Sequence, residues 1–479
     1  MNDSLTSGMR KALDLQKQLH IKEGPPSVQL RKDRLDRCIA MIKKYQEKVI
    51  QSIQEDFGNR DPVMSVMTEV ESSIGSLNHA KKNITSWVRP TKRRPEVPGL
   101  GSLIRLLGAK ARIEYQPKGT VGVISPWNFP VNLILAPMAG IFAAGNRAMI
   151  KPSEITPHTS LLIKEMFNEF YDEAEVAVFT GDSDLGASFS RLPFDHLIFT
   201  GGTEIARHVM RAASENLVPL TLELGGKSPV IVSDTANIKK TATRVMIGKT
   251  MNAGQICLAP DYALIPKDKI NDFVKESQAA ISDMYPQIKD NQDYTSIINS
   301  KHYERIQSYL EDAKIKGAEV VEINPSEENF SQQEHHKIPP TLVLNPTDDM
   351  KIMQEEIFGP VLPIKSYEEL EESVNYINSK ERPLGLYYFG DNKEEEEFVL
   401  NNTTSGGVTL NDVIWHVGQE NLPFGGIGPS GMGSYHGVDG FKEFSHLKSI
   451  YKQPSLDLMK LAGFVPPYNK NKEDKTTTS

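Results

Sequence analysis

Apolar residues recur at helical spacing through the first part of the chain. Between Leu30 and Trp87 they alternate with charged residues, which predicts two or three amphipathic helices. Cys38 falls on the apolar side of this pattern, so we expect it to be packed in the interior. Proline, glycine and basic residues interrupt the pattern from Arg89 to Leu100, and apolar side chains on one face of Ala111 to Gln116 then predict an extended segment.

Short β-branched runs and amphipathic stretches alternate in the next part of the chain. Strands and helices are predicted in turn for Val121 to Ser125, Val131 to Asn146, Ala148 to Lys151, His158 to Phe170, Val176 to Thr180, Leu185 to Arg191, His196 to Thr200 and Glu204 to Asn216. Parallel strands need crossover connections, so this alternation predicts a doubly wound parallel sheet that binds ligands at the carboxyl ends of its strands. A second α/β region is predicted from Leu220 to about Thr404, and two such units leave a cleft between them.

The last part of the chain has a different character. Glycine is dense from Gly406 to Phe444, where helical periodicity disappears. The residues after Tyr468 carry no apolar side chains that could pack, which predicts a mobile tail. The pattern as a whole therefore predicts an α/β protein with two sheet-centred units.

Size and charge narrow the class of protein. At 479 residues the chain is longer than the roughly 250 to 300 residues at which a single core stops growing, so two or more structural units are expected. The net charge is -8 and the basic residues are spread along the chain, which argues against a nucleic-acid partner. Val131 to Gly145 is the most apolar stretch but falls short of the ~20 residues that span a bilayer, so no membrane helix is predicted.

The cysteines and one pair of histidines exclude further classes. Two cysteines cannot make a disulfide framework, and Met1 to His20 lacks the apolar run of a signal peptide, so we expect a cytoplasmic protein. His335 and His336 are adjacent and lack the spacing of metal ligands. We therefore expect no metal site.

Three candidate catalytic groups lie in turns or at a strand end. Cys257 stands in the segment M-N-A-G-Q-I-C-L-A-P, between a glycine-containing approach and a proline. In isolation a cysteine is more often a small buried apolar residue than a nucleophile. Asn128, in a proline-bounded turn after a strand, is either an oxyanion donor or, more commonly, a turn-forming residue. Glu223 points to the opposite face of its strand from its leucine neighbours and is either an exposed carboxylate or a base.

Two further turns carry groups that suit a nucleotide. Lys151 and Glu154 follow a strand, where a cation and an acid can bracket a ribose, although a solvated loop is an equal alternative. Gly201, Gly202 and Thr203 lie between a strand and the helix predicted from Glu204, an arrangement that directs backbone N–H groups at a pyrophosphate. Each of these patterns is weak on its own.

Taken together, the motifs resemble the aldehyde dehydrogenase superfamily over nearly the whole chain. Those that occur in the family's order and spacing are Ser125-Pro-Trp-Asn-Phe-Pro130, Lys151-Pro-Ser-Glu154, Phe199-Thr-Gly-Gly-Thr203, Leu222-Glu-Leu-Gly-Gly-Lys-Ser-Pro229, Gly254-Gln-Ile-Cys257, Glu355-Glu-Ile-Phe-Gly-Pro360 and Leu422-Pro-Phe-Gly-Gly426. The short N-terminal arm and the runs from Met353 to Phe358 and from Ser430 to His436 are similar to the class 3 branch, which acts on fatty or aromatic aldehydes.

The resemblance implies a role for each candidate catalytic residue. Cys257 is then the nucleophile, Glu223 is the general base, and Asn128 forms the oxyanion hole with the backbone N–H of Cys257. An unperturbed thiol is only a few per cent ionised at neutral pH, so a base and a polar setting help to activate it. The implied reaction is the NAD(P)-dependent oxidation of medium- or long-chain aliphatic or aromatic aldehydes to carboxylic acids, through a thiohemiacetal and a thioester on the cysteine.

The resemblance also implies a cofactor site assembled from several motifs. Its residues are Trp127, Lys151, Glu154, Gly201, Gly202, Thr203, Glu356 and Phe358. Lys151 and Glu154 would hold the adenosine ribose, and Glu356 and Phe358 the nicotinamide end. Glu154 can accept a hydrogen bond from a ribose 2′-hydroxyl but repels a 2′-phosphate. Because Lys151 offsets part of that repulsion, NAD is expected to be preferred and NADP also accepted.

A three-part architecture and a homodimer follow from the same resemblance. An NAD(P)-binding domain would comprise residues 1–88 and 118–224, followed by a second α/β catalytic domain at residues 225–404. Residues 89–117 and 405–455 would form a small β bridging unit for oligomerisation. Residues 456–479 would form a C-terminal tail.

One motif departs from the family pattern. The family usually has Gly-Ser-Thr and then a glycine three residues after the threonine. This chain has Gly201, Gly202 and Thr203 followed by Ala206. The hydroxyl that normally faces the pyrophosphate is therefore missing.

Two alternative functions were weighed against this interpretation. A CoA-acylating aldehyde dehydrogenase would transfer the acyl group to CoA instead of water, and Glu223 argues against it because that branch generally lacks the water-activating acid. A nucleotide-binding protein without chemistry would not need Cys257, Asn128 and Glu223 together. Aldehyde oxidation by water therefore remains the expected function.

Overall fold

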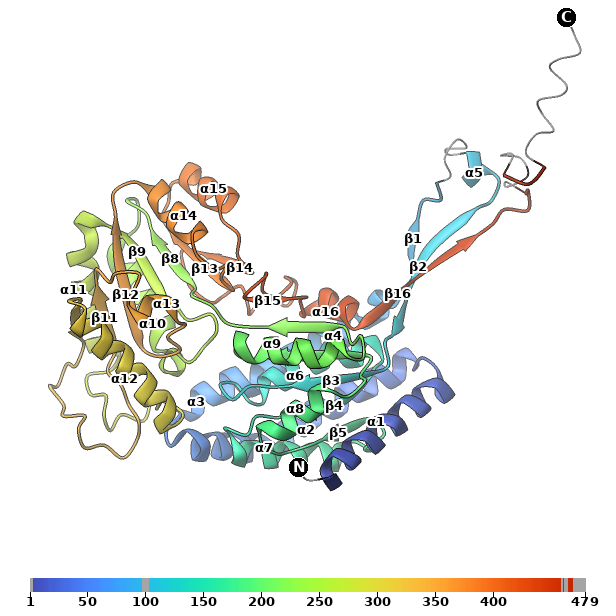
Figure 1. The fold of residues 1–479 in the computed structure, drawn as a ribbon, viewed down its shortest axis with the longest axis horizontal. Coiled ribbons are helices and arrows are strands. Elements are labelled where there is room, and N and C mark those ends of the chain that lie inside the picture. The colour runs from blue at the N-terminus through green and yellow to red at the C-terminus, as the bar shows by residue number, and fades with distance from the viewer. Residues whose placement is uncertain (1–2, 97–102, 458–459, 461–463, 468–479) are drawn as a thin grey trace, which may run out of the picture.

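Two α/β bodies lie next to each other, and a narrow arm of strands projects away from one of them (Figure 1). This computed structural model describes residues 3–96, 103–457, 460 and 464–467. The tail predicted to be mobile, after Tyr468, lies outside the described residues. In the part of the chain that is described, no helix is both long and apolar enough to cross a membrane.

The first body is built around a six-stranded sheet in the order β15-β7-β6-β3-β4-β5. Its strands are β3 (Thr120–Ile124), β4 (Arg147–Lys151), β5 (Val176–Val178), β6 (His196–Thr200), β7 (Leu220–Glu223) and β15 (Gly431–Met432). All neighbours are parallel except β15, which runs antiparallel to β7. The register pairs Ile124 with Lys151 and Thr200 with Glu223, so these strands end at one edge of the sheet. The predicted doubly wound parallel sheet is confirmed.

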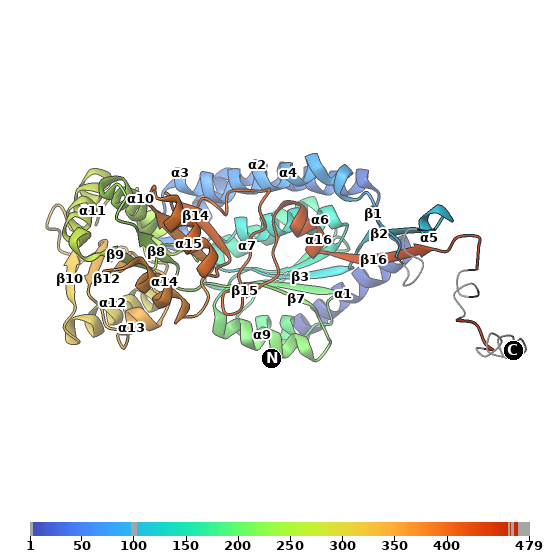
Figure 2. The same ribbon diagram turned by 90° about the horizontal axis from the view of Figure 1, so that it is seen from above.

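Helices cover both faces of this sheet (Figure 2). One face carries α2 (Val28–Phe57), α4 (Ser72–Trp87), α6 (Asn132–Ala144) and α7 (Pro157–Phe170), and the other α1 (Asp3–Glu23), α8 (Ser183–Ser190) and α9 (Thr203–Ser214). Between α2 and α4 lie the short helix α3 (Pro62–Ser65) and the π-helix η1 (Val66–Glu71). The amphipathic helices predicted before residue 88 are therefore present, and Cys38 is buried as predicted. Helix α1 is not among the predicted helices, although Met9 and Leu13 bury its inner face against the sheet.

The second body is built around a seven-stranded sheet in the order β10-β11-β12-β9-β8-β13-β14. Its strands are β8 (Pro229–Val232), β9 (Tyr262–Pro266), β10 (Glu319–Glu322), β11 (Thr341–Leu344), β12 (Val361–Tyr367), β13 (Gly385–Phe389) and β14 (Gly407–Leu410). Its helices are α10 (Ile238–Thr250), η2 (Met251–Gly254), η3 (Lys267–Lys269), α11 (Ile270–Met284), α12 (Ser300–Ile315), α13 (Lys351–Gln354), α14 (Leu370–Asn378) and α15 (Lys393–Asn402). Only β10 pairs in the antiparallel sense, and the region has the predicted α/β form. Its predicted start at Leu220 was wrong, because Leu220–Glu223 forms β7 and pairs with β6 in the first sheet.

The projecting arm is a three-stranded antiparallel sheet in the order β1-β2-β16. It consists of β1 (Thr91–Arg93), β2 (Lys110–Pro117) and β16 (Ser445–Lys452), with α5 (Leu103–Leu106) near its tip and α16 (Gly437–Glu443) at its base. The glycine-rich segment 405–455 is divided among all three sheets, because β14 joins the second sheet and β15 the first. Of that segment only β16 belongs to the arm. Leu447 and Tyr451 are exposed on β16, so the arm presents apolar surface to solvent.

Candidate active site

Cys257 lies in a loop that a short left-handed stretch turns back after α10. Asn252, Ala253 and Gly254 have φ angles of 48°, 52° and 72°. A Cβ on Gly254 would lie 2.3 Å from the carbonyl oxygen of Gly359, so only glycine fits there. The other two residues hold a conformation that side chains rarely adopt, which is typical of functional loops. This turn brings Cys257 to the wall of a cavity of about 230 Å³ between the two bodies.

Asn128 lines the same cavity and is tied to the cysteine loop. Its Nδ2 donates to the backbone oxygen of Gln255 at 3.1 Å, which orients the amide and uses one of its two N–H groups. Its backbone oxygen accepts from Asn252 Nδ2 at 3.3 Å and from Arg60 Nη1 at 2.9 Å. Asn128 is buried, and hydrogen bonds fix both its side-chain amide and its backbone oxygen. The second N–H of the amide remains for another acceptor.

Glu223 is the last residue of β7 and reaches the same cavity. Neither of its carboxylate oxygens has a hydrogen-bond partner among the described residues, and burial raises its pKa well above the ordinary value. Burial likewise raises the pKa of the Cys257 thiol, and the charges of Glu223 and Glu356 raise it further. The backbone N–H groups of Cys257 and Leu258 offset part of this effect. The thiol and the carboxyl group are therefore both harder to ionise in this cavity than in water.

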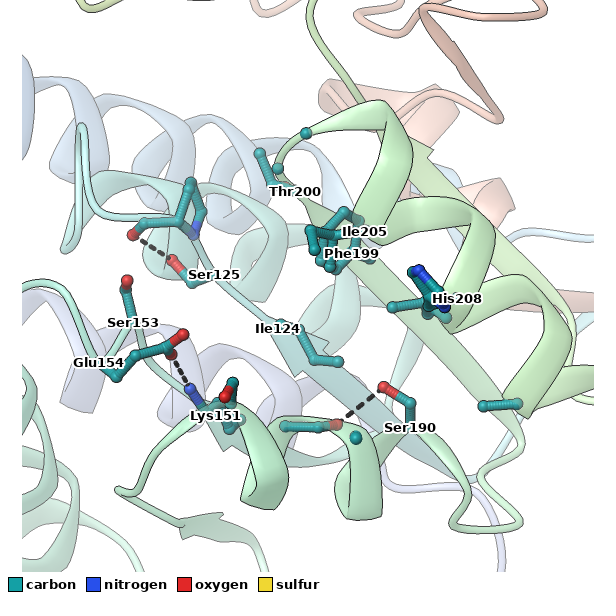
Figure 3. Close-up of a pocket in the computed structure, with 18 of the residues that line it drawn as sticks. Ile124, Ser125, Lys151, Ser153, Glu154, Ser190, Phe199, Thr200, Ile205 and His208 are labelled. Atoms are coloured by element: carbon teal, nitrogen blue, oxygen red, sulfur yellow. Dashed lines mark hydrogen bonds and ion pairs between the residues drawn. The ribbon is translucent and has the colours of Figure 1, made fainter. Parts of the chain in front are cut away.

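A larger cavity of about 650 Å³ runs along the carboxyl edge of the first sheet. It shares Trp127, Gly201 and Gly202 with the smaller cavity, so the two form one crevice. Figure 3 shows Lys151 and Glu154 joined by an ion pair on one side of it. Ile205 and His208 of α9 lie across from them, as the same view shows.

The turn before α9 joins the two cavities. A Cβ on Gly201 would lie 2.6 Å from the ring of Phe199, whereas a Cβ on Gly202 would meet nothing within 4 Å. Gly202 is the N-cap of α9, so the N–H groups of the first helical turn face the crevice. Thr203 lines neither of these two cavities. It borders a third, more polar cavity, and its hydroxyl donates to the backbone oxygen of Pro429 at 3.3 Å.

Glu356 and Phe358 close the other end of the smaller cavity. Glu356 is half-buried, and one of its carboxylate oxygens is fully buried and has no partner among the described residues. Burial, followed by the charge of Asp261, raises its pKa to about 8. A Cβ on Gly225 would lie 2.2 Å from a carboxylate oxygen of Glu356, so the glycine permits this close approach. Phe358 has a φ of 48° and packs edge-on against Trp127, with ring centroids 5.3 Å apart.

Several residues at the crevice were not among the predicted site residues. His302 and Arg305 lie on α12 and line the smaller cavity, and His208 lines the larger one. Arg305 donates to the backbone oxygens of Glu356 and Ile357 at 3.2 and 2.8 Å and so fixes that loop. The only available signal was the three-residue spacing of His302 and Arg305, which places both on one face of a helix. No cluster of potential metal ligands occurs in the described ranges.

The crevice has the features that a nicotinamide dinucleotide needs. A helix N-terminus with open space at Gly202 suits a pyrophosphate, and the partnerless oxygen of Glu356 is an acceptor that ribose hydroxyls can satisfy. The two lobes of the crevice meet at Trp127. The fold and the crevice thus suit an oxidoreductase in which a nicotinamide cofactor would approach Cys257.

Known proteins extend this assignment. The sequence model of the aldehyde dehydrogenase family matches residues 14–450. A probable coniferyl aldehyde dehydrogenase of Caulobacter vibrioides is 57% identical over 467 residues, which are 98% of this chain and 96% of that protein. Aldehyde dehydrogenase family 3 member A2 of Rattus norvegicus is 35% identical over 427 residues, which are 88% of this chain and 83% of that protein. The solved substrate-bound state of Staphylococcus aureus AldH matches with a TM-score of 0.88 at 36% identity and covers 97% of this chain and 98% of that chain.

The chain belongs to the aldehyde dehydrogenase family. It is an NAD(P)-dependent oxidoreductase that converts aldehydes to carboxylic acids. The similarity to a family 3 protein also confirms the expected likeness to the class 3 branch.

Proposed function

We propose that this enzyme oxidises aromatic aldehydes of the coniferyl type to the corresponding carboxylic acids and prefers NAD to NADP. The observation that carries the proposal is one cavity lined by Cys257, Asn128 and Glu223 and continuous with the crevice at the sheet edge. The name of the Caulobacter vibrioides relative, at 57% identity, supports an aromatic substrate.

Cys257 begins the reaction as the nucleophile. Its thiol first releases a proton to solvent, the thiolate sulfur then attacks the aldehyde carbon, and the carbonyl oxygen becomes an alkoxide in a thiohemiacetal. The free N–H of Asn128 and the backbone N–H of Cys257 stabilise that negative charge. What the cofactor supplies is a hydride acceptor, so the adduct on Cys257 can lose hydride and become a thioester.

Glu223 completes the reaction as a general base. It removes a proton from a water molecule, whose oxygen attacks the thioester carbon and releases the carboxylic acid. The sulfur of Cys257 leaves as the thiolate and recovers a proton. A raised pKa suits Glu223 to this task, because a base titrating closer to neutral pH can both take and return a proton.

The cofactor would be held along the whole crevice. Lys151 and Glu154 suit the adenosine ribose, and the N-terminus of α9 at Gly202 suits the pyrophosphate. Glu356 and Phe358, with Trp127 beside them, suit the nicotinamide end. Glu154 is paired with Lys151 but half exposed, so its carboxylate remains able to repel a 2′-phosphate, which supports a preference for NAD.

The test follows the absorbance of reduced nicotinamide with coniferyl aldehyde, benzaldehyde and a medium-chain aliphatic aldehyde. We expect the highest kcat/KM for coniferyl aldehyde, and a higher value for the aliphatic aldehyde would overturn the substrate assignment. The same assay is repeated with CoA, and the products are separated by chromatography. Free acid at an unchanged rate is expected, whereas an acyl-CoA product would favour the CoA-acylating alternative.

A homodimer, formed through the arm, is also part of the proposal. The β1-β2-β16 sheet carries exposed Leu447 and Tyr451, and its outer strands leave backbone groups that a second chain could pair. Light scattering should give about twice the 53.4 kDa of one chain, and a mass near 53.4 kDa would contradict the dimer. The division into a cofactor domain and a catalytic domain likewise remains a proposal, with a bridging unit that keeps only β16 of the expected segment 405–455. The cytoplasmic location is a proposal as well.

A further inference from the structure

A fully buried ion pair lies beneath the turn that carries Asn128. Arg60, just before α3, and Glu69, in the π-helix η1, have no exposed side-chain surface, and Arg60 Nη2 lies 3.1 Å from Glu69 Oε1. The guanidinium lies over the rings of Phe57 and Phe129, at 5.0 and 4.9 Å from their centroids. Burial lowers the pKa of Arg60 and raises that of Glu69, and the opposite charge of each partner counteracts both shifts.

Each partner of the pair holds a different side of this turn. Arg60 Nη1 donates to the backbone oxygen of Asn128 at 2.9 Å. Glu69 Oε2 accepts from the backbone N–H groups of Val131 and Asn132 at 3.1 and 2.8 Å, at the start of α6. Because a carboxylate at a helix N-terminus is favoured by the helix dipole, Glu69 anchors the helix that the turn leads into. The peptide plane at Asn128 and the beginning of α6 are therefore fixed by one charged unit.

This unit also reaches the cysteine loop through Asn128. Asn252 Nδ2 donates to the same backbone oxygen of Asn128 and, at 3.2 Å, to that of Gln255. Asn128 Nδ2 returns a hydrogen bond to Gln255, two residues before Cys257. The orientation of the Asn128 side-chain amide is consequently set in two ways. Arg60 and Asn252 donate to the Asn128 backbone oxygen, and the side chain itself donates to Gln255.

Stability alone does not account for a charged pair in this place. Replacing a buried ion pair by apolar residues of similar volume is often neutral or stabilising, because both charges lose their hydration. Here such a replacement would remove donors and acceptors from Asn128, Val131 and Asn132. Glu69 also lies in a π-helical stretch, a distortion that occurs frequently at functional sites.

We propose that Arg60 and Glu69 are positioning residues for the oxidation reaction, and that they act by holding the Asn128 amide where it stabilises the alkoxide on Cys257. This inference rests on the role of Asn128 in the proposed function. It predicts that loss of the two-sided contacts of the Arg60 guanidinium lowers the rate of the reaction at Cys257 but leaves the Kd for the cofactor unchanged.

The main test is a double-mutant cycle of Arg60→Lys and Asn128→Ala. Lysine keeps the charge but cannot contact Asn128 and Glu69 through separate nitrogens in the fixed geometry of a guanidinium. Arg60→Lys should lower kcat about tenfold, because a small misplacement of a catalytic group costs this much or more. In the Asn128→Ala background the same change should lower kcat by less than about twofold, since the two residues act as one unit. A full additional tenfold loss in that background would overturn the inference.

Arg34→Lys provides a matched control. Arg34 also forms a buried ion pair, with Glu175 at 2.9 Å, but it lies on α2 and does not line either cavity of the crevice. Arg60→Lys should lower kcat much more than Arg34→Lys at a similar loss of melting temperature and an unchanged Kd for NAD. Equal effects on kcat would show that Arg60 is only structural.

A cofactor-free assay isolates the chemistry at the cysteine. Hydrolysis of a nitrophenyl ester needs the nucleophile and the oxyanion donors but no nicotinamide, and Arg60→Lys should slow it by a factor similar to that for kcat. An unchanged ester rate would overturn the inference.

Glu69→Gln, which keeps the shape of the side chain, should show the same pattern and serves as the test if Arg60→Lys does not fold. If Asn128→Ala alone leaves kcat unchanged, the role of Asn128 in the proposed function is wrong. That result is distinct from additive effects of Arg60→Lys and Asn128→Ala, which would contradict only the positioning role of Arg60.

Discussion

A serine introduced at Gly202 should strengthen cofactor binding. The position has φ and ψ of -76° and 145°, which any residue can adopt, and a Cβ there would meet nothing within 4 Å. Serine is also a better N-cap than glycine by a few tenths of a kcal/mol, so α9 should not suffer. The new hydroxyl would face the place where a pyrophosphate is expected. It should therefore restore the hydrogen bond that the usual family motif provides.

The size of the effect can be worked from the geometry. A hydrogen bond to a charged group contributes about 1.5 to 3 kcal/mol. The serine hydroxyl would also cap α9, and because the two interactions compete, we expect the gain in binding free energy to lie near the lower limit. A gain of about 1.4 kcal/mol corresponds to a tenfold lower Kd. Titration calorimetry with NAD measures it directly. Gly201→Ser is the control, because its Cβ would lie 2.6 Å from the Phe199 ring and should weaken binding. A Kd for Gly202→Ser within about twofold of the parent would refute the reasoning.

Four further predictions concern the proposed catalytic and cofactor residues. Cys257→Ala should abolish turnover and leave NAD binding intact in a calorimetric titration, and residual turnover within about tenfold of the parent would contradict its role. Asn128→Ala should lower kcat by ~10² to 10³ with little change in KM, measured by steady-state kinetics. Glu154→Gln should narrow the ratio of kcat/KM for NAD over NADP, and an unchanged ratio would show that another residue discriminates. Burial raises the Glu223 pKa, so the folded protein keeps a proton that the unfolded chain releases, and the resulting loss of stability grows as the pH rises. Glu223→Gln should stop turnover and remove this loss. Calorimetry should therefore show a larger increase in Tm for this variant at about pH 8 than at about pH 5.

The parts of the fold that repeat a local pattern could be predicted from the sequence. Alternating strands and helices after residue 120 predict a parallel sheet, and the register indeed brings Ile124, Lys151, Thr200 and Glu223 to one edge. The division of the glycine-rich segment among three sheets could not be predicted in the same way. Strands such as β15 are only two residues long and are defined by the partner they pair with.

The parts of the site that depend on buried charge had no sequence signal. Arg60 lies in the connection between α2 and α3, and Glu69 lies in a helix; charged residues in such places are usually exposed, and only tertiary packing places these two inside. Ala253 carries a left-handed φ that its residue type gives no reason to expect. Neighbouring Gly254, by contrast, could be recognised as a turn residue. Motifs thus indicate candidate reacting groups, whereas the residues that hold these groups in place are set by long-range contacts.

In the proposed mechanism, the two ionisable groups at the centre of the site constrain the order of the chemistry. The sequence led us to expect a polar setting that helps to ionise Cys257, but burial and the charge of Glu223 raise its pKa instead. Two negative charges in one buried cavity oppose each other, so the thiolate forms most easily while Glu223 is protonated. Once the sulfur is part of a thioester it is neutral, and that repulsion disappears. On the proposed mechanism, Glu223 then ionises more readily and activates water, so acylation of Cys257 favours the base that the second step needs.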